Sequence, residues 1–333
     1  MKKIILSILS IFFLTGCSLF KSDALKDVDV YTTTYPVNYI INYLYGENAK
    51  IYSIYPSDVN FKEYQLSEKK LNEFAKSSLF VFNSQDIDRN YAVDMVNINS
   101  DLKLIDTTLG MYYTYSIEEL WLNPYNYLMM AKNTKTSLNE YIKDPYLNKQ
   151  INEKYEELQY ELSKLDATYK ETLKNAKYKT IVTDNELFKF LEKYNIEVIS
   201  LEEDIKNIII KDGDNLSDIS KEYNVSISDI LTYNNKLDET LKIGETLKIP
   251  VKTIDSSNVN KVKKLISENN IEYIFSNNKE SNSIVTELID NYNLELVRIN
   301  TMYSINGDIN NTNDNYLTIM NDNLELLKKE LYK

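Results

Sequence analysis

Histidine is missing from this chain of 333 residues. Its absence removes the commonest metal ligand and the commonest general base in proteins, so any chemistry has to proceed without imidazole. Cysteine occurs once, as Cys17, which excludes a disulfide framework within the chain. The 6 glycines, the 5 prolines and the wealth of Tyr, Asn, Lys and Ile together indicate a low-GC coding bias.

Positive charge is also in short supply. Lys and Arg number 38 against 50 Asp and Glu, for a formal net charge of −12, and loss of Lys2 and Lys3 with a cleaved leader makes the chain more acidic still. Such a chain repels phosphates, so a nucleic-acid partner is excluded. The length and a hydrophobic content of 43% are sufficient for two or three domains with buried cores.

The N-terminus has the layout of a secretory signal. Residues 1–16 contain two lysines and an apolar run too short to span a bilayer comfortably, and they end in Leu-Thr-Gly before Cys17. This ending resembles a bacterial lipobox, in which the cysteine thiol receives a diacylglyceryl group. The resemblance implies lipid anchoring on the outer face of the membrane, within the wall of a Gram-positive-type cell, with residues 17–27 as a tether. An uncleaved membrane anchor is the alternative.

Alternating strand-like and helix-like patterns follow and predict an α/β fold. Strand-like runs begin at Val28 and at residues 77–84 and 102–108, and an amphipathic helix is expected over 67–76. We assign residues 28–145 to an N-terminal α/β lobe on this basis.

One long amphipathic helix is predicted over residues 146–177, because apolar residues recur there at spacings of three and four. Four further strand-like runs then indicate a second lobe, built from residues 178–204 and 252–333. Two α/β lobes joined by a long helix imply a cleft between them, the usual place for a ligand. A coiled-coil partner surface on the helix is the weaker reading, because its apolar stripe lasts under four heptads.

The second lobe is interrupted by residues 205–251, which we expect to form a small strand–helix–helix–strand insert. Residues 208–251 carry the runs DGDNLSDI, YNVS, DI, NN, IG and LKIP in order, and they resemble a LysM domain over their whole length. The resemblance implies a βααβ fold that binds N-acetylglucosamine units of peptidoglycan. The resemblance assigns the glycan-binding groove to Gly213, Asp214, Asn215, Leu216, Asn234, Asn235 and Leu237. A LysM fold without sugar binding is the alternative.

The two lobes together resemble the zinc- and manganese-binding lipoproteins of ABC importers. The colinear residues are YTTTYPVNYII near the start, the stretch from YPSDVN to FVFNS, LWLNPYNYLMMAKN, FKFLEKYNIEVISLEED, SENNIEYIFSNN and NYLTIMNDNLELLKKEL. In that family a zinc or manganese ion lies between the lobes, held by histidines from three loops and a carboxylate from a fourth. The resemblance also implies a possible ABC permease partner.

The family's metal ligands are all replaced in this sequence. Its three histidines fall at Lys62, at Glu119 two residues before Trp121, and at Asp184, which leads into a helix expected over 188–195. Its late carboxylates fall at Asn277 and Asn300. Tetrahedral zinc sites use thiolate or imidazole, so high-affinity zinc binding is not expected and no cofactor is predicted.

Three interpretations of these replaced positions remain open. The oxygen donors Glu119, Asp184, Asn277 and Asn300 suit a harder cation such as calcium or manganese. The ammonium of Lys62 instead repels a divalent ion, and it is able to replace such an ion as the positive charge among the carboxylates. Drift at a disused site predicts the same residues.

The function that follows is that of a non-enzymatic, peptidoglycan-associated solute-binding lipoprotein with a degenerate metal site. A wall-anchored scaffold that no longer carries cargo is the alternative, and so is a carrier of a hard cation or another small polar ligand. An enzyme on the wall is the weakest interpretation, because no histidine or second thiol serves nucleophilic catalysis, and the many carboxylates lack a recognisable glycosidase setting.

Overall fold

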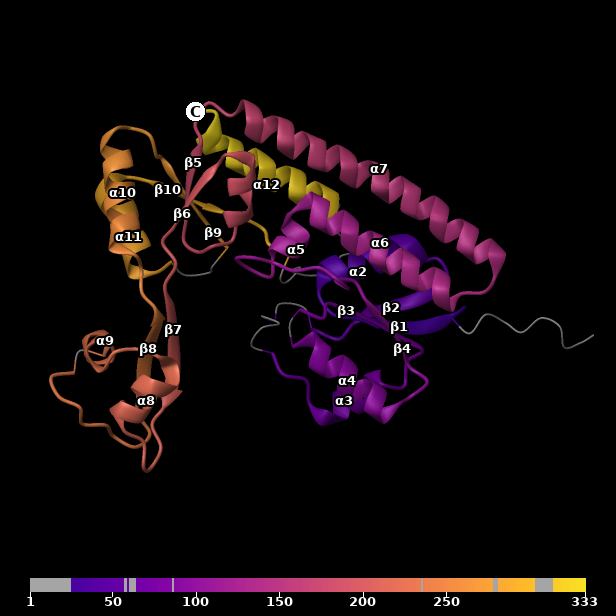
Figure 1. Cartoon of the computed structure of the whole chain (residues 1–333), viewed down its shortest axis with the longest axis horizontal. Helices are drawn as coiled ribbons and strands as arrows, with labels where there is room; N and C mark the ends of the chain where they lie inside the picture. The colour runs from indigo at the N-terminus through magenta and orange to yellow at the C-terminus, as the bar shows by residue number, and fades with distance from the viewer. Residues whose placement is uncertain are drawn as a thin grey trace, which may run out of the picture. The chain divides into compact units, whose positions relative to one another are not determined.

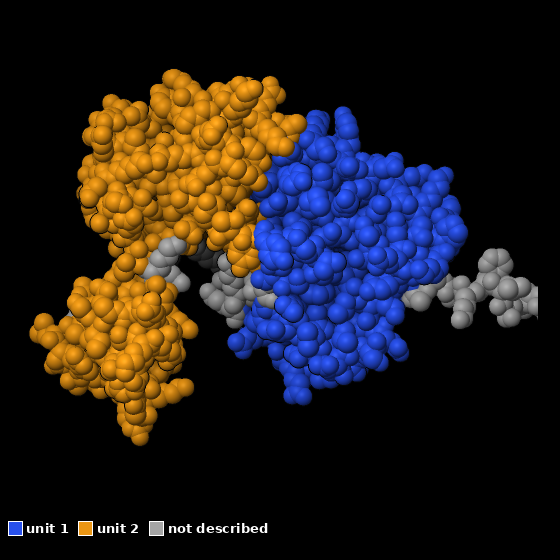
Figure 2. All heavy atoms as spheres, viewed as in Figure 1, with its two compact units in different colours: residues 1–112, 120–166, 302–318 blue, residues 113–119, 167–301, 319–333 orange. Residues whose placement is uncertain are grey.

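The computed structural model describes residues 25–56, 59, 64–85, 87–234, 236–277, 281–302 and 314–333. The leader with Cys17, and also Lys62 and Asn235, lie outside the described residues. The chain forms two compact units (Figure 2). Unit 1 comprises residues 1–112, 120–166 and 302–318, and unit 2 comprises residues 113–119, 167–301 and 319–333. Within the described part of the chain, no helix combines the length and apolar character needed to cross a membrane.

Unit 1 contains a four-stranded parallel sheet in the order β2-β1-β3-β4, and its strands are labelled in Figure 1. Its strands are β1 (Val28–Thr32), β2 (Ala49–Ser53), β3 (Leu79–Phe82) and β4 (Lys103–Asp106). Its helices are α2 (Tyr35–Tyr45), α3 (Glu68–Phe74), α4 (Asp88–Ile98) and α6 (Pro124–Tyr141), and the short α5 (Glu119–Leu122) precedes α6.

The predicted strands of unit 1 are confirmed, and one more is present. All four residues of β3 are buried, as expected for a central strand of a parallel sheet covered on both faces. The additional strand, β2, pairs only with β1 and has no fully buried residue. An edge strand of this kind lacks the apolar run that reveals a central strand in a sequence.

Buried tyrosines of unit 1 pack against one another around the start of α6. The rings of Tyr127 and Tyr316 stack with their centroids 3.6 Å apart, and both side chains are fully buried. Each hydroxyl is satisfied, because Tyr127 donates to the Pro36 carbonyl at 2.7 Å and Tyr316 donates to the Trp121 carbonyl at 2.6 Å. The tryptophan segment therefore serves as an anchor for the start of helix α12 (Tyr316–Leu331).

Unit 1 is expected to lose stability in alkali as its buried tyrosines ionise. Burial, and then the Asp314 carboxylate, raises the pKa of Tyr35 to about 12, and burial raises the pKa of Tyr127 well above its ordinary 10.0. Because the pKa values of these tyrosines are raised in the folded state, their neutral hydroxyls contribute their full stability below pH 10. This contribution declines as the pH rises through about 12. Tyrosinate absorbance and circular dichroism should therefore change together. Smooth ionisation with the fold intact would contradict this expectation.

Unit 2 contains a second four-stranded parallel sheet in the order β10-β9-β5-β6. Its strands are β5 (Thr180–Thr183), β6 (Glu197–Ser200), β9 (Tyr273–Ser276) and β10 (Glu295–Arg298), and its helices include α10 (Ser256–Ser267) and α11 (Ser283–Tyr292). The strands' apolar residues form one core with these helices. The helix expected over 188–195 is a 3-10 helix, η1 (Lys189–Tyr194), which ends at Asn195 in a left-handed conformation.

The long helix predicted after Pro145 is present as α7 (Pro145–Asn175). Every apolar position of its predicted stripe is buried, namely Leu147, Ile151, Tyr155, Leu158, Leu162, Leu165, Tyr169 and Leu173. Tyr169 donates its hydroxyl to the Met320 carbonyl of α12 at 2.7 Å. Helical periodicity of this length is the most reliable signal in a sequence, since each of eight turns repeats it.

Residues 204–252 form a separate small module within unit 2. Strands β7 (Asp204–Ile209) and β8 (Thr246–Lys252) pair antiparallel, and helices α8 (Leu216–Tyr223) and α9 (Ile227–Tyr233) lie between them in the chain. Both helices begin with side-chain caps, from Asn215 and Ser226. The module has its own apolar core, which consists of Ile210, Leu216, Ile219, Val225, Ile230, Leu247 and Ile249.

Candidate functional site

The carboxyl ends of β5 and β9 meet at the centre of the second sheet. Asp184 directly follows β5 and is 2% exposed, and its backbone N–H donates to the Phe275 carbonyl at 3.0 Å. The hydroxyl of Ser276, the last residue of β9, donates to Asp184 Oδ2. Strand order reverses between β5 and β9, because the chain proceeds from β5 outward to β6 and from β9 outward to β10. Open α/β sheets bind ligands at such a switch point.

Arg298 completes this group from the neighbouring strand. It is the last residue of β10, and its Nη1 donates to Ser276 Oγ at 3.0 Å. Ser276 therefore accepts from a guanidinium and donates to a carboxylate. Sequence reasoning found Asp184 but missed Ser276 and Arg298, since the three meet only through the registers of β5 with β9 and of β9 with β10.

The two asparagines that the family resemblance assigns to late carboxylate positions are bonded within the protein. Asn277 accepts a hydrogen bond at Oδ1 from the amide of Asn185, at 2.6 Å. Asn300 is exposed, and its backbone N–H and carbonyl both bond to the buried side chain of Asn323. The amide oxygen of Asn277 is thus already engaged by an internal donor.

Glu119 lies in the segment 113–119, at the first residue of α5. Its Oε2 accepts the backbone N–H of Thr114 at 3.1 Å, and the side chain is half-buried. The same segment bonds to η1, because the Tyr115 hydroxyl donates to Glu192 at 3.4 Å. In the described part of the chain, Glu119 and Asp184 belong to no cluster of three or more acidic, cysteine or histidine residues able to hold a metal ion.

The donor set does not fit zinc. Zinc sites in proteins use imidazole or thiolate, and this sequence holds no histidine and a single cysteine at position 17. Asp184 accepts from the Ser276 hydroxyl, and that hydroxyl accepts in turn from the Arg298 guanidinium.

The predicted glycan positions of the module fall into two groups. Gly213, Asp214 and Asn215 lie in an exposed turn, where Gly213 has a φ of +90°, and Leu237 is fully exposed. Leu216 is instead part of the module's core. Asn234 has a structural role, because its side chain bonds to both the N–H and the carbonyl of Lys248, at 2.8 and 2.7 Å.

The loop before β8 is fixed by Glu245, which gives a prediction for acid. Glu245 accepts the Lys242 N–H at 2.9 Å and pairs with Lys236 at 3.0 Å. The backbone bond from Lys242, and then the bond from Lys236, lowers the pKa of Glu245 below its ordinary 4.5. Because the pKa of Glu245 is lower in the folded state, the ionised carboxylate stabilises the module above pH 4.5. This stabilisation is lost as the pH falls through the pKa of the folded state. Glu245→Gln should therefore make the stability of the module, followed by NMR, depend less on pH in acid. An unchanged pH dependence would contradict this.

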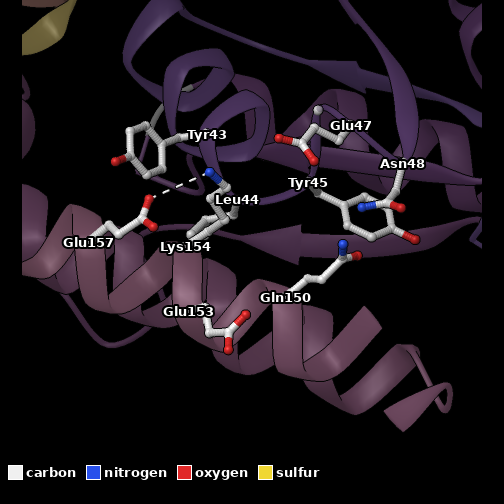
Figure 3. Close-up of a pocket in the computed structure, with 10 residues that line it drawn as sticks. Tyr43, Leu44, Tyr45, Glu47, Asn48, Gln150, Glu153, Lys154 and Glu157 are labelled. Atoms are coloured by element: carbon white, nitrogen blue, oxygen red, sulfur yellow. Dashed lines mark hydrogen bonds and ion pairs between the residues drawn. The ribbon is translucent and has the colours of Figure 1, made fainter. Parts of the chain in front are cut away.

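A cavity of about 220 Å³ lies elsewhere in unit 1, between the end of α2 and the first half of α7 (Figure 3). Its wall includes Glu47, Glu153 and Glu157, and Lys154 pairs with Glu157 at 3.5 Å. None of the sequence-predicted site residues lines this cavity.

Comparison with known proteins identifies the class of this α/β architecture as that of solute-binding proteins. The family model described as zinc-uptake complex component A, periplasmic (ZnuA), matches residues 30–251, which is more than half of the chain. The chain belongs to this family, whose members are substrate-binding proteins of metal ABC transporters. The predicted fold class and family are thereby confirmed.

Solved structures of similar fold come from several bacteria. The Zn(II)-bound ZnuA-like domain of AdcA from Streptococcus pneumoniae has a TM-score of 0.65 at 17% identity, over 92% of this chain and 100% of that one. The metal-dependent lipoprotein YcdH from Bacillus subtilis gives the same values. The laminin-binding protein Lbp of Streptococcus pyogenes has a TM-score of 0.62 at 14% identity, over 92% and 99%. Curated protein sequences gave no significant match.

Proposed function

We propose that this protein is a lipid-anchored solute-binding lipoprotein whose zinc site has been lost and whose module at 204–252 binds peptidoglycan. The main support for the loss of the zinc site is the hydrogen bonding of Asp184. The buried Asp184 carboxylate, which the resemblance assigns to a ligand position, is bonded to Ser276, and no imidazole exists in the sequence to complete a zinc site.

Metal content tests the first part of the proposal. The full mature chain, purified without chelator, should contain no stoichiometric zinc or manganese, and saturating zinc should leave its Tm unchanged. A ligand at 100 times its Kd stabilises a fold by about 2.7 kcal/mol, so binding would be visible. Retained zinc that raises the Tm would refute the loss of the site, whereas a shift with calcium or manganese alone would favour a carrier of a hard cation.

Wall binding by the module rests on its sequence and its shape. Its LysM-like runs lie on a βααβ module with a separate core, and the turn at Gly213 and Asp214 and the loop at Leu237 are open to solvent. The full mature chain should co-sediment with purified peptidoglycan and be released by N-acetylglucosamine oligomers. A Leu237→Ala variant should bind less while its Tm is unchanged, because this side chain is fully exposed. Equal retention of both proteins would refute this site.

Membrane anchoring is proposed from Cys17, which lies outside the described residues. Cys17→Ala should release the protein into the medium or leave an unprocessed precursor, because only the thiol can accept the diacylglyceryl group. Unchanged membrane fractionation of the variant would count against lipidation.

Partnership with an ABC permease is proposed from family membership, and catalysis is not part of the proposal. The scaffold alternative is distinguished by genetics in the native cell. A scaffold should remain fully functional in a strain that lacks every metal-type permease, whereas a carrier should not.

A further inference from the structure

The switch point of the second sheet holds a charge pair joined through one hydroxyl. We infer that the guanidinium of Arg298 takes the place of a bound cation there and balances the buried carboxylate of Asp184 through Ser276. Both polar links are defined, because Arg298 Nη1 donates to Ser276 Oγ at 3.0 Å and the Ser276 hydroxyl donates to Asp184 Oδ2. The inference rests on the proposed loss of the zinc site.

Burial makes a balancing charge necessary. Asp184 is 2% exposed and Ser276 is fully buried, and an isolated carboxylate in such a place is costly unless it is paired and hydrogen-bonded. Arg298 comes from the strand next to β9 and lies in register with Ser276. Arg298 is an exposed residue that contacts Ser276, so a cation of the protein itself lies one hydroxyl away from the carboxylate.

The identity of the residue supports this role. Arg89 and Arg298 are the only arginines in a chain that otherwise uses lysine for its positive charges. Arginine presents a rigid, always-charged fork of donors, whereas lysine is a compact and strongly hydrated point charge. A planar fork of donors is the better group for a fixed link to a serine at a strand end, so arginine suits this position better than lysine.

A consequence is that unit 2 reaches its folded, charge-balanced state without a divalent ion. Asn277 supports the same conclusion, since its amide oxygen accepts from Asn185 at 2.6 Å. Two positions that the family resemblance assigns to metal ligands are thus bonded to internal donors.

The test is a set of variants of the full mature chain, measured by thermal unfolding in the presence of EDTA. Arg298→Gln should lower the Tm by about 5 °C, and the matched control Arg89→Gln, at an exposed position of α4, should leave it unchanged. Arg298→Lys should recover only part of the loss. In the Arg298→Gln, Asp184→Asn double variant, most of the stability should return, because neither charge is then left unpaired.

A second readout separates charge balance from mere packing. Millimolar MnCl2 or CaCl2, added after removal of EDTA, should raise the Tm of Arg298→Gln by several degrees and leave wild type and Arg89→Gln unchanged. The inference would be overturned if Arg298→Gln had the same Tm as Arg89→Gln. It would also be overturned if the effects of Arg298→Gln and Asp184→Asn on the Tm were strictly additive. Zinc binding by wild type that Asp184→Asn leaves intact would overturn only the proposed loss of the site. Zinc binding that Asp184→Asn abolishes would overturn both.

Discussion

Replacing Glu330 with alanine is expected to lower the free energy of unfolding of this protein by about 3–5 kcal/mol. Glu330 lies in α12 and is completely buried. Its Oε2 accepts the backbone N–H groups of Glu272 and Tyr273, both at 2.9 Å, where β9 begins. Its Oε1 lies 2.6 Å from the Lys333 ammonium, whose side chain is 9% exposed. Alanine would leave two N–H donors and one charge without their partner.

Two further substitutions make this prediction specific. Glu330→Gln keeps an acceptor for the N–H groups and leaves the Lys333 ammonium its longer pair with Glu272, at 3.9 Å, so the loss should be smaller, about 1–3 kcal/mol. Glu325→Gln on the same helix is the matched control, because its pair with Lys328 is largely exposed and should contribute under about 1 kcal/mol. Urea unfolding measures all three. Equal midpoints for Glu330→Ala and Glu325→Gln would contradict the assigned role.

The second large effect is expected from Leu247→Ala in the small module. Leu247 is fully buried in β8, and a buried leucine-to-alanine change costs about 2–5 kcal/mol. A domain of this size seldom gains more than about 3–5 kcal/mol from its core, so this one change is sufficient to unfold it. Peptidoglycan retention should then be lost, while the rest of the chain keeps its own unfolding transition.

The control for this variant is Ile209→Ala on the partner strand. Ile209 is 65% exposed, so its replacement removes little buried area and should leave the module's NMR spectrum folded. If Leu247→Ala kept both a folded spectrum and full wall binding, the core assigned to the module would be wrong.

The sequence predicted most of the architecture because its signals were long or entirely apolar. Helix α7 repeats its apolar stripe over 31 residues, and β3 is a run of four buried apolar residues. The failures were short elements shaped by their surroundings. Strand β2 is an edge strand with a mixed pattern, and η1 has helical spacing but ends after six residues at Asn195, whose φ is +61°.

The candidate site shows where sequence reasoning reaches its limit. Family resemblance led to Asp184, which is one residue beyond a recognisable strand. Ser276 and Arg298 are distant from it in sequence, and their link depends on a three-strand register that no local pattern encodes. The expectation for Lys62 stays a prediction, because that residue lies outside the described part of the chain.

The antiparallel pairing of β7 with β8 has a mechanical consequence. Asp204 pairs with Lys252, so the chain enters and leaves the module at adjacent strand positions, about 5 Å apart. Tension between the module and the rest of the protein would pull both strands from the same end. The two strands would then share the load, because they are pulled in the same direction and not away from each other. The Tyr233 hydroxyl donates to Glu203 beside this entrance, so in a protein tethered at both membrane and wall the load would reach the module through both strands and helix α9 together.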